Sequence, residues 1–339
     1  MLSLLLLLVG CGAPVSSLAS PSPTATSPYS VVTSTAHVPQ LSIQATIPVG
    51  SLGMGITSAD GAVWVVTISP KAQLLRIDPA SNTVTATLDL PGRNGPGDNS
   101  WLAYGGGSLW ISRTYAEEID HVSIAPLMIT ARIRVADPFD VAYGFGSVWV
   151  PQFRTSTWSR IDPSTNTVVT TAQATGPTSV VTDAGSVWVL AHAVGQVLRI
   201  DPSTRAVIAT TVLSDGPERI VAGFGSLWMA DPEVAAINRI DEKTGKQSTE
   251  ILLRTSELEA PLVVAAGGGY VWVGGDHFLS RIDPHTNRLT AGLTLPYDNK
   301  VCGPATAYLC IGGVTYANGS VWVVDWNHGQ VLRVAPSSR

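Results

Sequence analysis

Three histidines near carboxylates are the residues of this sequence best suited to chemistry. His192, His277 and His328 each follow a tryptophan within about six residues; Asp276 directly precedes His277, and Asp325 lies just before His328. An imidazole beside a carboxylate is suited to act as a general base or a metal ligand. The alternative is that these are dispersed loop residues whose side chains never converge on one ligand.

Other polar and aromatic side chains occupy comparable positions and are candidates for ligand binding. Those that follow the tryptophans are Arg113, Gln152, His192, Asp231, Asp325 and Trp326. Those between the repeats are Asn94, Asp98, Asn99, Asp215, Glu218, Arg219, Glu257, Asp298, Asn299 and Lys300. Loops held by a rigid scaffold often carry function. Solvated surface polarity is the alternative for any one of them.

Familiar catalytic and cofactor motifs are missing from the sequence. It has no serine flanked by glycines in a nucleophile elbow, no His-Glu-x-x-His and no Asp-rich calcium loop. The glycine-rich segments 105–108 and 267–270 precede predicted strands and do not open helices, so they indicate no phosphate site. We therefore expect no cofactor and no metal. A quinoprotein-like propeller would need inward-facing Arg, Asn and Asp residues that we cannot align.

A recurring phrase close to Gly-Ser-Val-Trp-Val defines the elements that must position these residues. Its tryptophans are Trp64, Trp110, Trp149, Trp188, Trp228, Trp272 and Trp322. Intervals of about 40 to 50 residues are typical of a β-propeller with one four-stranded blade per repeat. Histidines at comparable positions in three repeats would then lie on the same face of the propeller.

The clearest repeat predicts the four strands of a blade. We assign them to Ser179–Thr182, Ser186–Leu190, Gln196–Ile200 and Ala206–Val212. The second strand is almost wholly apolar, as expected where both faces of a sheet are buried between neighbouring blades. Asp-Pro pairs such as Asp201-Pro202 favour a tight turn between the third and fourth strands.

The ends of the repeat region indicate how the propeller closes. The seventh repeat reaches only its third strand, Gln330–Val334, whereas Leu41–Pro48 resembles an isolated fourth strand. We predict that this N-terminal strand completes the last blade, which leaves no unpaired edge between first and last blades. The expected fold is all-β: a seven-bladed propeller of four-stranded blades over residues 40–339.

The N-terminal segment has the composition of an export signal and a tether. Residues 1–11 form an apolar run that ends in Leu-Val-Gly-Cys, which resembles a bacterial lipobox with Cys11 as the lipidated residue. A cleaved signal peptide without lipid is the alternative. Residues 12–39 are rich in Ser, Thr and Pro, and we expect them to be a disordered tether.

Cysteine usage and charge narrow the class of partner. Cys302 and Cys310 lie close together in a long connection, and in an exported chain we expect them to form a disulfide. The formal charge is −5, from 20 Lys and Arg against 25 Asp and Glu. An acidic surface repels phosphate backbones, so we expect no nucleic-acid partner. We also expect a monomer that meets the membrane only through its lipid.

Strings such as Ala45-Thr-Ile-Pro-Val-Gly50, together with Arg-Ile-Asp-Pro, resemble YVTN repeats. The chain from about 41 to 334 thus resembles the YncE-like propellers, which are related to the streptogramin B (virginiamycin B) lyases. Lyase repeats place a glutamate three residues after the tryptophan. Here those positions hold Thr67, Arg113, Gln152, Ala191, Asp231, Gly275 and Asp325. The resemblance therefore implies the fold and does not carry over the catalysis.

The sequence favours a non-catalytic, lipid-anchored propeller facing the periplasm or the cell exterior. It would bind an unknown small molecule or protein. The alternative is a lyase-like or hydrolase-like enzyme with a His/Asp site at the mouth of the central channel, using His277, His328 and Asp276.

Overall fold

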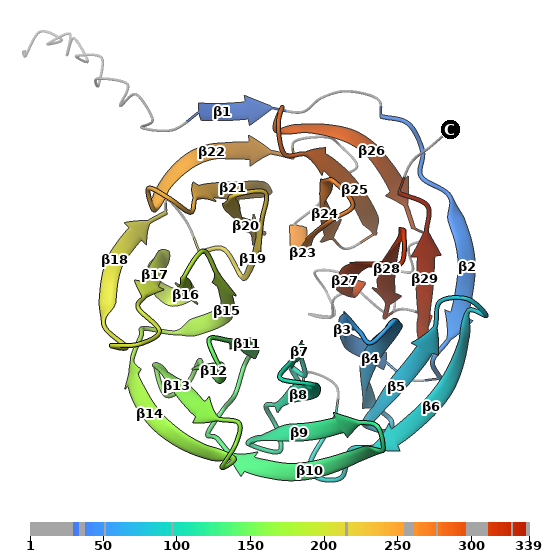
Figure 1. Ribbon diagram of the computed structural model, residues 1–339. Coiled ribbons are helices and arrows are strands. Elements are labelled where there is room, and N and C mark those ends of the chain that lie inside the picture. The colour runs from blue at the N-terminus through green and yellow to red at the C-terminus, as the bar shows by residue number, and fades with distance from the viewer. Residues whose placement is uncertain are drawn as a thin grey trace, which may run out of the picture.

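Seven sheets surround a central axis in the computed structural model (Figure 1). The structure describes residues 30–33, 38–50, 52–95, 98–213, 216–253, 261–275, 277–295, 311–326 and 328–336. Blades 1 to 7 are numbered from the sheet that begins with β3. The predicted all-β, seven-bladed propeller is confirmed.

Each blade has four antiparallel strands, ordered from the channel outward. The innermost strands are β3 (Leu52–Ala59), β7 (Leu102–Gly105), β11 (Ala142–Gly144), β15 (Pro177–Asp183), β19 (Arg219–Gly223), β23 (Pro261–Gly267) and β27 (Ile311–Ala317). The second strands are β4 (Ala62–Ser69), β8 (Ser108–Arg113), β12 (Ser147–Gln152), β16 (Ser186–Ala191), β20 (Ser226–Asp231), β24 (Tyr270–Gly275) and β28 (Ser320–Asp325).

The outer half of each blade carries the repeated turns. The third strands are β5 (Gln73–Asp78), β9 (Glu118–Ile124), β13 (Thr157–Asp162), β17 (Gln196–Ile200), β21 (Ala236–Asp241), β25 (Phe278–Asp283) and β29 (Gln330–Val334). The outermost strands are β6 (Thr83–Asp89), β10 (Leu127–Arg134), β14 (Thr167–Gln173), β18 (Val207–Val212), β22 (Lys246–Leu252), β26 (Arg288–Thr294) and β2 (Ile43–Pro48). A short 3-10 helix, η1 (His192–Val194), follows β16.

The repeated tryptophans form the core between blades. All seven are at most 1% exposed. Each indole Nε1 donates to the carbonyl of the residue five positions earlier, as Trp64 does to Ala59 at 3.1 Å and Trp322 to Ala317 at 3.0 Å. The buried polar atom is therefore satisfied while the ring fills the space between sheets.

Arginines on the third strands join neighbouring blades. The Arg333 guanidinium lies 5.3 Å from the Trp322 ring centroid, and its Nε donates to Ser320 Oγ at 2.9 Å. Its Nη1 donates to Pro79 O at 2.6 Å and Asn82 Oδ1 at 3.0 Å in blade 1. The repeated Ser, Trp, Arg, Pro and Asn residues thus form one stabilising contact that the sequence shows only as separate motifs.

The N-terminal strand closes the propeller as predicted. β2 pairs antiparallel with β29, placing Thr46 opposite Leu332. Blade 7 is therefore built from both ends of the folded region, and β2 supplies its outermost strand (Figure 1).

The expected tether from 12 to 39 is not wholly unstructured. β1 (Ser30–Thr33) pairs in parallel with β22 on blade 5, and Gln40 bridges to Gly292 on blade 6. Ser30-Val-Val-Thr33 has β-branched residues, and the free edge of β22 offers the backbone partners that an isolated segment lacks. Residues 1–29, including Cys11, lie outside the described residues, as do Cys302 and Cys310. In the described part of the chain, no helix has the length and apolarity needed to cross a membrane.

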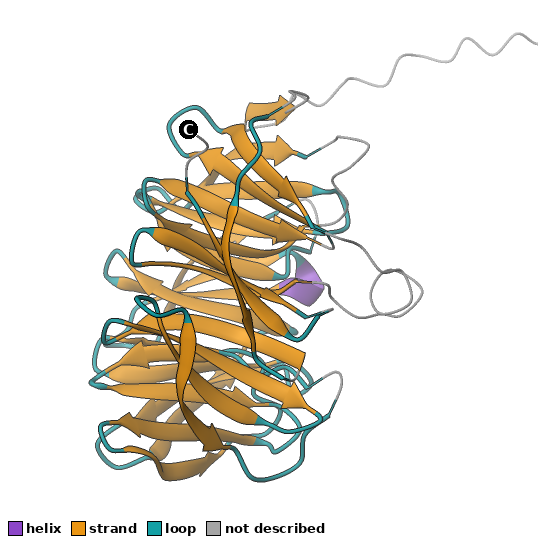
Figure 2. Ribbon diagram, turned by 90° about the vertical axis from the view of Figure 1, so that its right-hand side faces the viewer, coloured by secondary structure: helices purple, strands orange, loops and turns teal. Residues whose placement is uncertain are grey.

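The two faces of the propeller carry different loops. One face carries the loops between second and third strands and the connections between blades, including η1 (Figure 2). We call it the loop face. The opposite face carries the turns between first and second strands and between third and fourth strands, and we call it the hairpin face.

Candidate functional site

Four residues from four blades meet where the innermost strands begin, at the loop-face mouth of the channel. Arg219 opens β19, Ser179 lies in β15, Asp140 precedes β11 and Trp101 precedes β7. Arg219 Nη1 lies 3.1 Å from Asp140 Oδ2, and the guanidinium carbon lies 3.1 Å from the Trp101 ring centroid. We call these four residues the central cluster.

The Asp140 carboxylate organises the central cluster. Its Oδ2 accepts from Ser179 Oγ at 2.7 Å and from the Val180 amide at 3.3 Å, and its Oδ1 accepts from the Val141 amide at 2.8 Å. Burial lowers the pKa of Arg219, and the Asp140 carboxylate opposes that shift. Arginine nevertheless stays charged in proteins, so the pair is an ion pair held between three blades.

Trp101 joins two core clusters at this mouth. It is half-buried and packs against one cluster that includes Met54 of β3 and a second that includes Val263 of β23. Its Nε1 has no hydrogen-bond partner among the described residues. The half-buried indole, stacked on the paired Arg219 guanidinium, offers an aromatic surface at the mouth, which suits recognition better than bond cleavage.

The predicted residues three positions after the tryptophans are directed into their own blades. Arg113 is fully buried and pairs with Asp120 Oδ2 at 3.2 Å. Gln152 Nε2 donates to Ala136 O at 2.8 Å, and Asp231 Oδ2 accepts from Asn238 at 3.3 Å. The Arg113 and Asp231 contacts join the second and third strands of their blades, whereas the Gln152 contact reaches the connection from blade 2 to blade 3. The polar groups of these three residues are engaged and buried, and ligand binding by them stays a prediction.

The buried pair of Arg113 and Asp120 shifts the pKa of the Asp120 carboxyl. Burial raises the pKa of Asp120 to about 6, although the Arg113 guanidinium acts in the opposite direction. Arg113 Nε and Nη2 have no hydrogen-bond partners among the described residues.

The three histidine-bearing loops belong to different blades. His192 Nδ1 lies 3.2 Å from Pro217 O, and its ring centroid lies 6.4 Å from that of Phe153. The His277 carbonyl accepts from the Leu295 amide at 2.7 Å. The β16–β17 and β28–β29 loops, which carry His192 and His328, lie on opposite sides of the propeller (Figure 1). Asp276 lies outside the described residues.

His328 has the most developed chemical setting of the three. Its Nδ1 lies 2.9 Å from Asp325 Oδ2, which also accepts from Gln330 Nε2 at 2.7 Å. Asp325 is 4% exposed. His328 borders a cleft of about 390 Å³ with Leu52 and Ser69 of blade 1. Trp326 is 5% exposed and belongs to the core cluster that contains Trp64.

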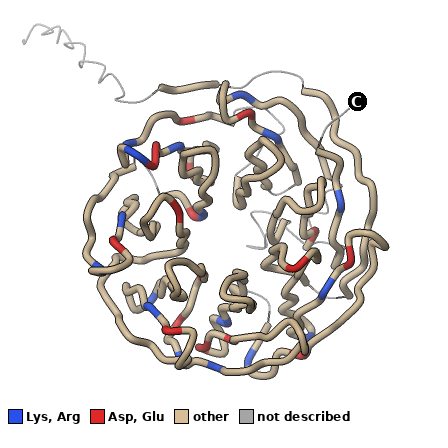
Figure 3. Tube along the Cα trace, in the orientation of Figure 1, with Lys and Arg blue, Asp and Glu red and all other residues tan. Residues whose placement is uncertain are grey.

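Sequence reasoning included only Arg219 of the central cluster. The repeat nevertheless places all four at equivalent positions, because Trp101, Asp140, Ser179 and Arg219 each lie nine residues before the repeated tryptophan of their own blade. Their residue types differ from blade to blade, so the repeated phrase does not single them out. Their shared signal is positional, since each lies near the start of an innermost strand. Charged residues of both signs are interspersed around the propeller (Figure 3), so charge alone would not have singled out this mouth.

Comparison with known proteins supports the architecture. No protein-family model matches the sequence, and no curated protein matches it. The crystal structure of the β-propeller domain of Cps50 (Swd1) from Myceliophteria thermophila is similar, with a TM-score of 0.72 and 12% identity. The match covers 88% of this chain and 100% of that domain. At this identity the similarity shows that the chain has a β-propeller fold.

Proposed function

We propose that this chain is an extracytoplasmic, lipid-anchored propeller that binds a ligand or protein partner without catalysing a reaction. The observation that carries the proposal is the central cluster, in which four blades place one side chain each at the mouth of the channel. The Asp140 carboxylate is already engaged by Arg219, Ser179 and two amides, so it is poorly suited to abstract a proton.

The fold supports the same conclusion. The repeated arginines bond to a serine of their own blade and to a carbonyl of the next blade, as Arg239 does to Ser226 and to Pro284. These residues stabilise the scaffold, so recognition must come from residues outside the repeat motifs. The resemblance to YncE-like propellers is consistent with a scaffold of this kind, and the lipobox at Cys11 would hold it at a membrane.

Arg219→Lys tests the central cluster, because lysine retains the charge but cannot reproduce the planar stack on Trp101. The purified chain would be screened by thermal shift against small carboxylates and aromatic acids, and affinities measured by calorimetry. We expect compounds that stabilise the wild type to bind about tenfold more weakly to the variant, the equivalent of about 1.4 kcal/mol. Equal binding to both proteins, or turnover of a bound compound, would contradict the proposal.

The anchor has its own test. Cys11→Ser should abolish incorporation of labelled palmitate and move the chain from the membrane fraction to the soluble fraction. Retention of the variant on membranes would argue against lipidation at Cys11.

A second candidate function is hydrolase-like or lyase-like chemistry at His328. The specific observation is the buried Asp325 bonded to His328 Nδ1 beside a cleft that Ser69 also borders. A carboxylate that fixes one imidazole nitrogen leaves the other to act as a base. If this candidate is right, His328→Ala and Asp325→Asn should each abolish turnover of ester or lactone substrates, whereas Arg219→Lys should not.

A further inference from the structure

A second hollow lies on the hairpin face, away from the central cluster. It has a volume of about 400 Å³ and is bordered by Ser58 and Asp60 of blade 1, Tyr104 of blade 2, and Tyr316 and Asn318 of blade 7. These blades are consecutive because β2 closes blade 7 next to blade 1. The hollow thus spans the point of ring closure, and we call it the tyrosine hollow.

Glycines fix the tyrosines of this face. Tyr316 lies against the hairpin of blade 6, where a Cβ added to Gly268 would be 2.4 Å from Tyr316 Cε2 and Cζ. In the same way a Cβ on Gly105 would lie 2.1 Å from Tyr143 Cδ1. The glycine-rich segments of the sequence therefore leave the space into which the tyrosine ring of the next blade packs. Such seating holds an aromatic ring in place before any ligand binds.

The rim of the tyrosine hollow is polar and exposed. Ser58, Asp60 and Asn318 are all exposed, and Tyr104 is 41% exposed. Asp60 and Asn318 both occupy left-handed turn positions, with φ of 49°. Asn318 Nδ2 donates to Gly61 O at 3.3 Å, which ties the turn of blade 7 to that of blade 1.

The composition of the lining limits the class of ligand. Among the described residues, no Lys, Arg or His borders the tyrosine hollow, so its lining there does not compensate the charge of a phosphate or carboxylate. A single carboxylate is too little to bind a divalent cation, which takes six or more oxygen ligands. Aromatic surfaces beside a carboxylate, an amide and a hydroxyl suit a molecule with apolar C–H faces and a rim of hydroxyl groups. We propose that the tyrosine hollow binds a neutral sugar.

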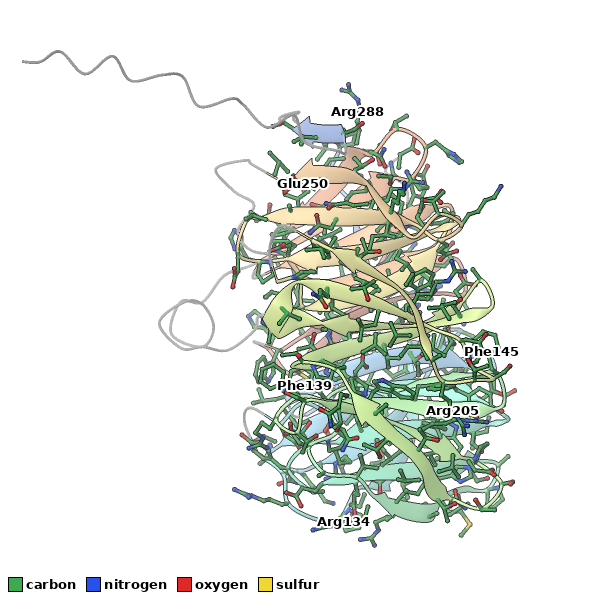
Figure 4. The ribbon with its side chains drawn as sticks, turned by 90° about the vertical axis from the view of Figure 1, so that its left-hand side faces the viewer. Arg134, Phe139, Phe145, Arg205, Glu250 and Arg288 are labelled. Atoms are coloured by element: carbon green, nitrogen blue, oxygen red, sulfur yellow. The ribbon has the colours of Figure 1, made fainter. Side chains whose placement is uncertain are left out.

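Two further aromatic residues are exposed on the hairpin face, in the turns between the first and second strands of blades 3 and 5. Phe145 and Phe224 are 46% and 42% exposed, and both have positive φ, 53° and 57°. Bulky residues rarely adopt this conformation, which favours Gly, Asn or Asp in tight hairpins. Figure 4 shows Phe145 on the hairpin face, on the other side of the propeller from Phe139.

Titration of the full-length chain with neutral sugars tests the proposal. The monosaccharides are glucose, galactose, mannose and N-acetylglucosamine, and the disaccharides are maltose, cellobiose, lactose and chitobiose. Binding would be detected by saturation-transfer NMR and quantified by calorimetry. We expect at least one sugar to bind. Tyr104→Ala should weaken its binding about two- to twelvefold, as expected for loss of about 0.5–1.5 kcal/mol of stacking, while Tyr104→Phe should retain it. Asp60→Ala should also weaken binding.

Val194→Ala is the matched control, because Val194 is 42% exposed in η1 on the loop face. Its binding should equal that of the wild type. Thermal unfolding would confirm that the Tyr104 and Asp60 variants are folded. The proposal fails if no sugar of the panel binds at tens of millimolar, or if binding is the same in wild type, Tyr104→Ala and Asp60→Ala. Because the central cluster lies on the opposite face, Arg219→Lys should leave sugar binding unchanged.

Discussion

Among single residues, Glu242 is a buried carboxyl whose hydrogen bonding is incomplete. It follows Asp241 in a turn of blade 5 and is 6% exposed, and its Oε1 has no hydrogen-bond partner among the described residues. Burial raises the pKa of Glu242 to about 7, and the nearby Asp183 carboxyl adds to the shift. The side chain is therefore protonated in the folded chain at pH values where the unfolded chain ionises it.

Glu242→Gln should stabilise the protein at alkaline pH and have little effect at acidic pH. Below the ordinary pKa of about 4.5 the wild-type carboxyl is protonated whether the chain is folded or not. As pH rises from about 4.5 to about 7, the wild type loses stability, because the unfolded chain ionises this carboxyl while the folded chain keeps it protonated; above about 7 the loss is complete. We expect a higher melting temperature for the variant at pH 8 and nearly equal values at pH 4.

The control is Glu233→Gln, an exposed glutamate of the same blade. Its melting temperature should differ little from the wild type at either pH. A Glu242→Gln effect of the same size at pH 4 and pH 8 would show that ionisation is not its cause.

The residues of the central cluster differ from most of those predicted to bind a ligand, and the reasons can be given residue by residue. Arg219 was predictable because a charged residue in a connection between blades is easily noticed. Trp101 was missed because it is not polar, although it lies nine residues before Trp110, as Arg219 lies nine residues before Trp228. Arg113 was predicted as a ligand-binding residue, yet Asp120, seven residues later on the paired strand, draws it inward.

At the scale of strands and turns, the sequence predicted the positions of the repeated strands accurately. Blade 4 was predicted over Ser179–Thr182, Ser186–Leu190, Gln196–Ile200 and Ala206–Val212, and each of these strands is observed within about two residues. The Asp-Pro turns also form as expected, with Asp78 Oδ1 accepting from the Ala80 amide at 2.9 Å. β1 was missed because its pairing depends on the exposed edge of β22, which local composition does not reveal.

Contacts between third strands and neighbouring turns should account for a measurable part of the stability. Arg333→Lys removes the planar group that reaches Pro79 and Asn82 of blade 1. We expect a loss of about 1.5–3 kcal/mol in the free energy of unfolding, as for hydrogen bonds to charged groups, measured by urea denaturation.

Arg76→Lys is the matched control for that measurement. Arg76 donates to Thr85 within blade 1 at 2.9 Å, and its guanidinium lies 6.0 Å from the Trp64 ring centroid. It should lose less stability than Arg333→Lys. Equal losses would show that the contact with the next blade contributes little.

At the scale of the whole molecule, the N-terminal segment follows the outer rim across three blades (Figure 1). β1 pairs with blade 5, Gln40 bridges to blade 6, and β2 completes blade 7. The closing strand was predictable, because the repeats lack one strand at their C-terminal end. The passage over blades 5 and 6 was not, since neither Ser30–Thr33 nor Gln40 belongs to a repeat.

Two truncations separate the contributions of this segment. A chain that begins at residue 38 loses β1 but keeps β2, so we expect it to unfold cooperatively at a slightly lower temperature. A chain that begins at residue 49 also loses β2, which exposes the edge of β29 and leaves blade 7 with three strands. Because a propeller depends on an unbroken ring, we expect this shorter chain to lose cooperative unfolding and to aggregate through the exposed strand. Thermal unfolding followed by circular dichroism, with light scattering, would distinguish the two, and identical melting of both chains would show that β2 is dispensable for closure.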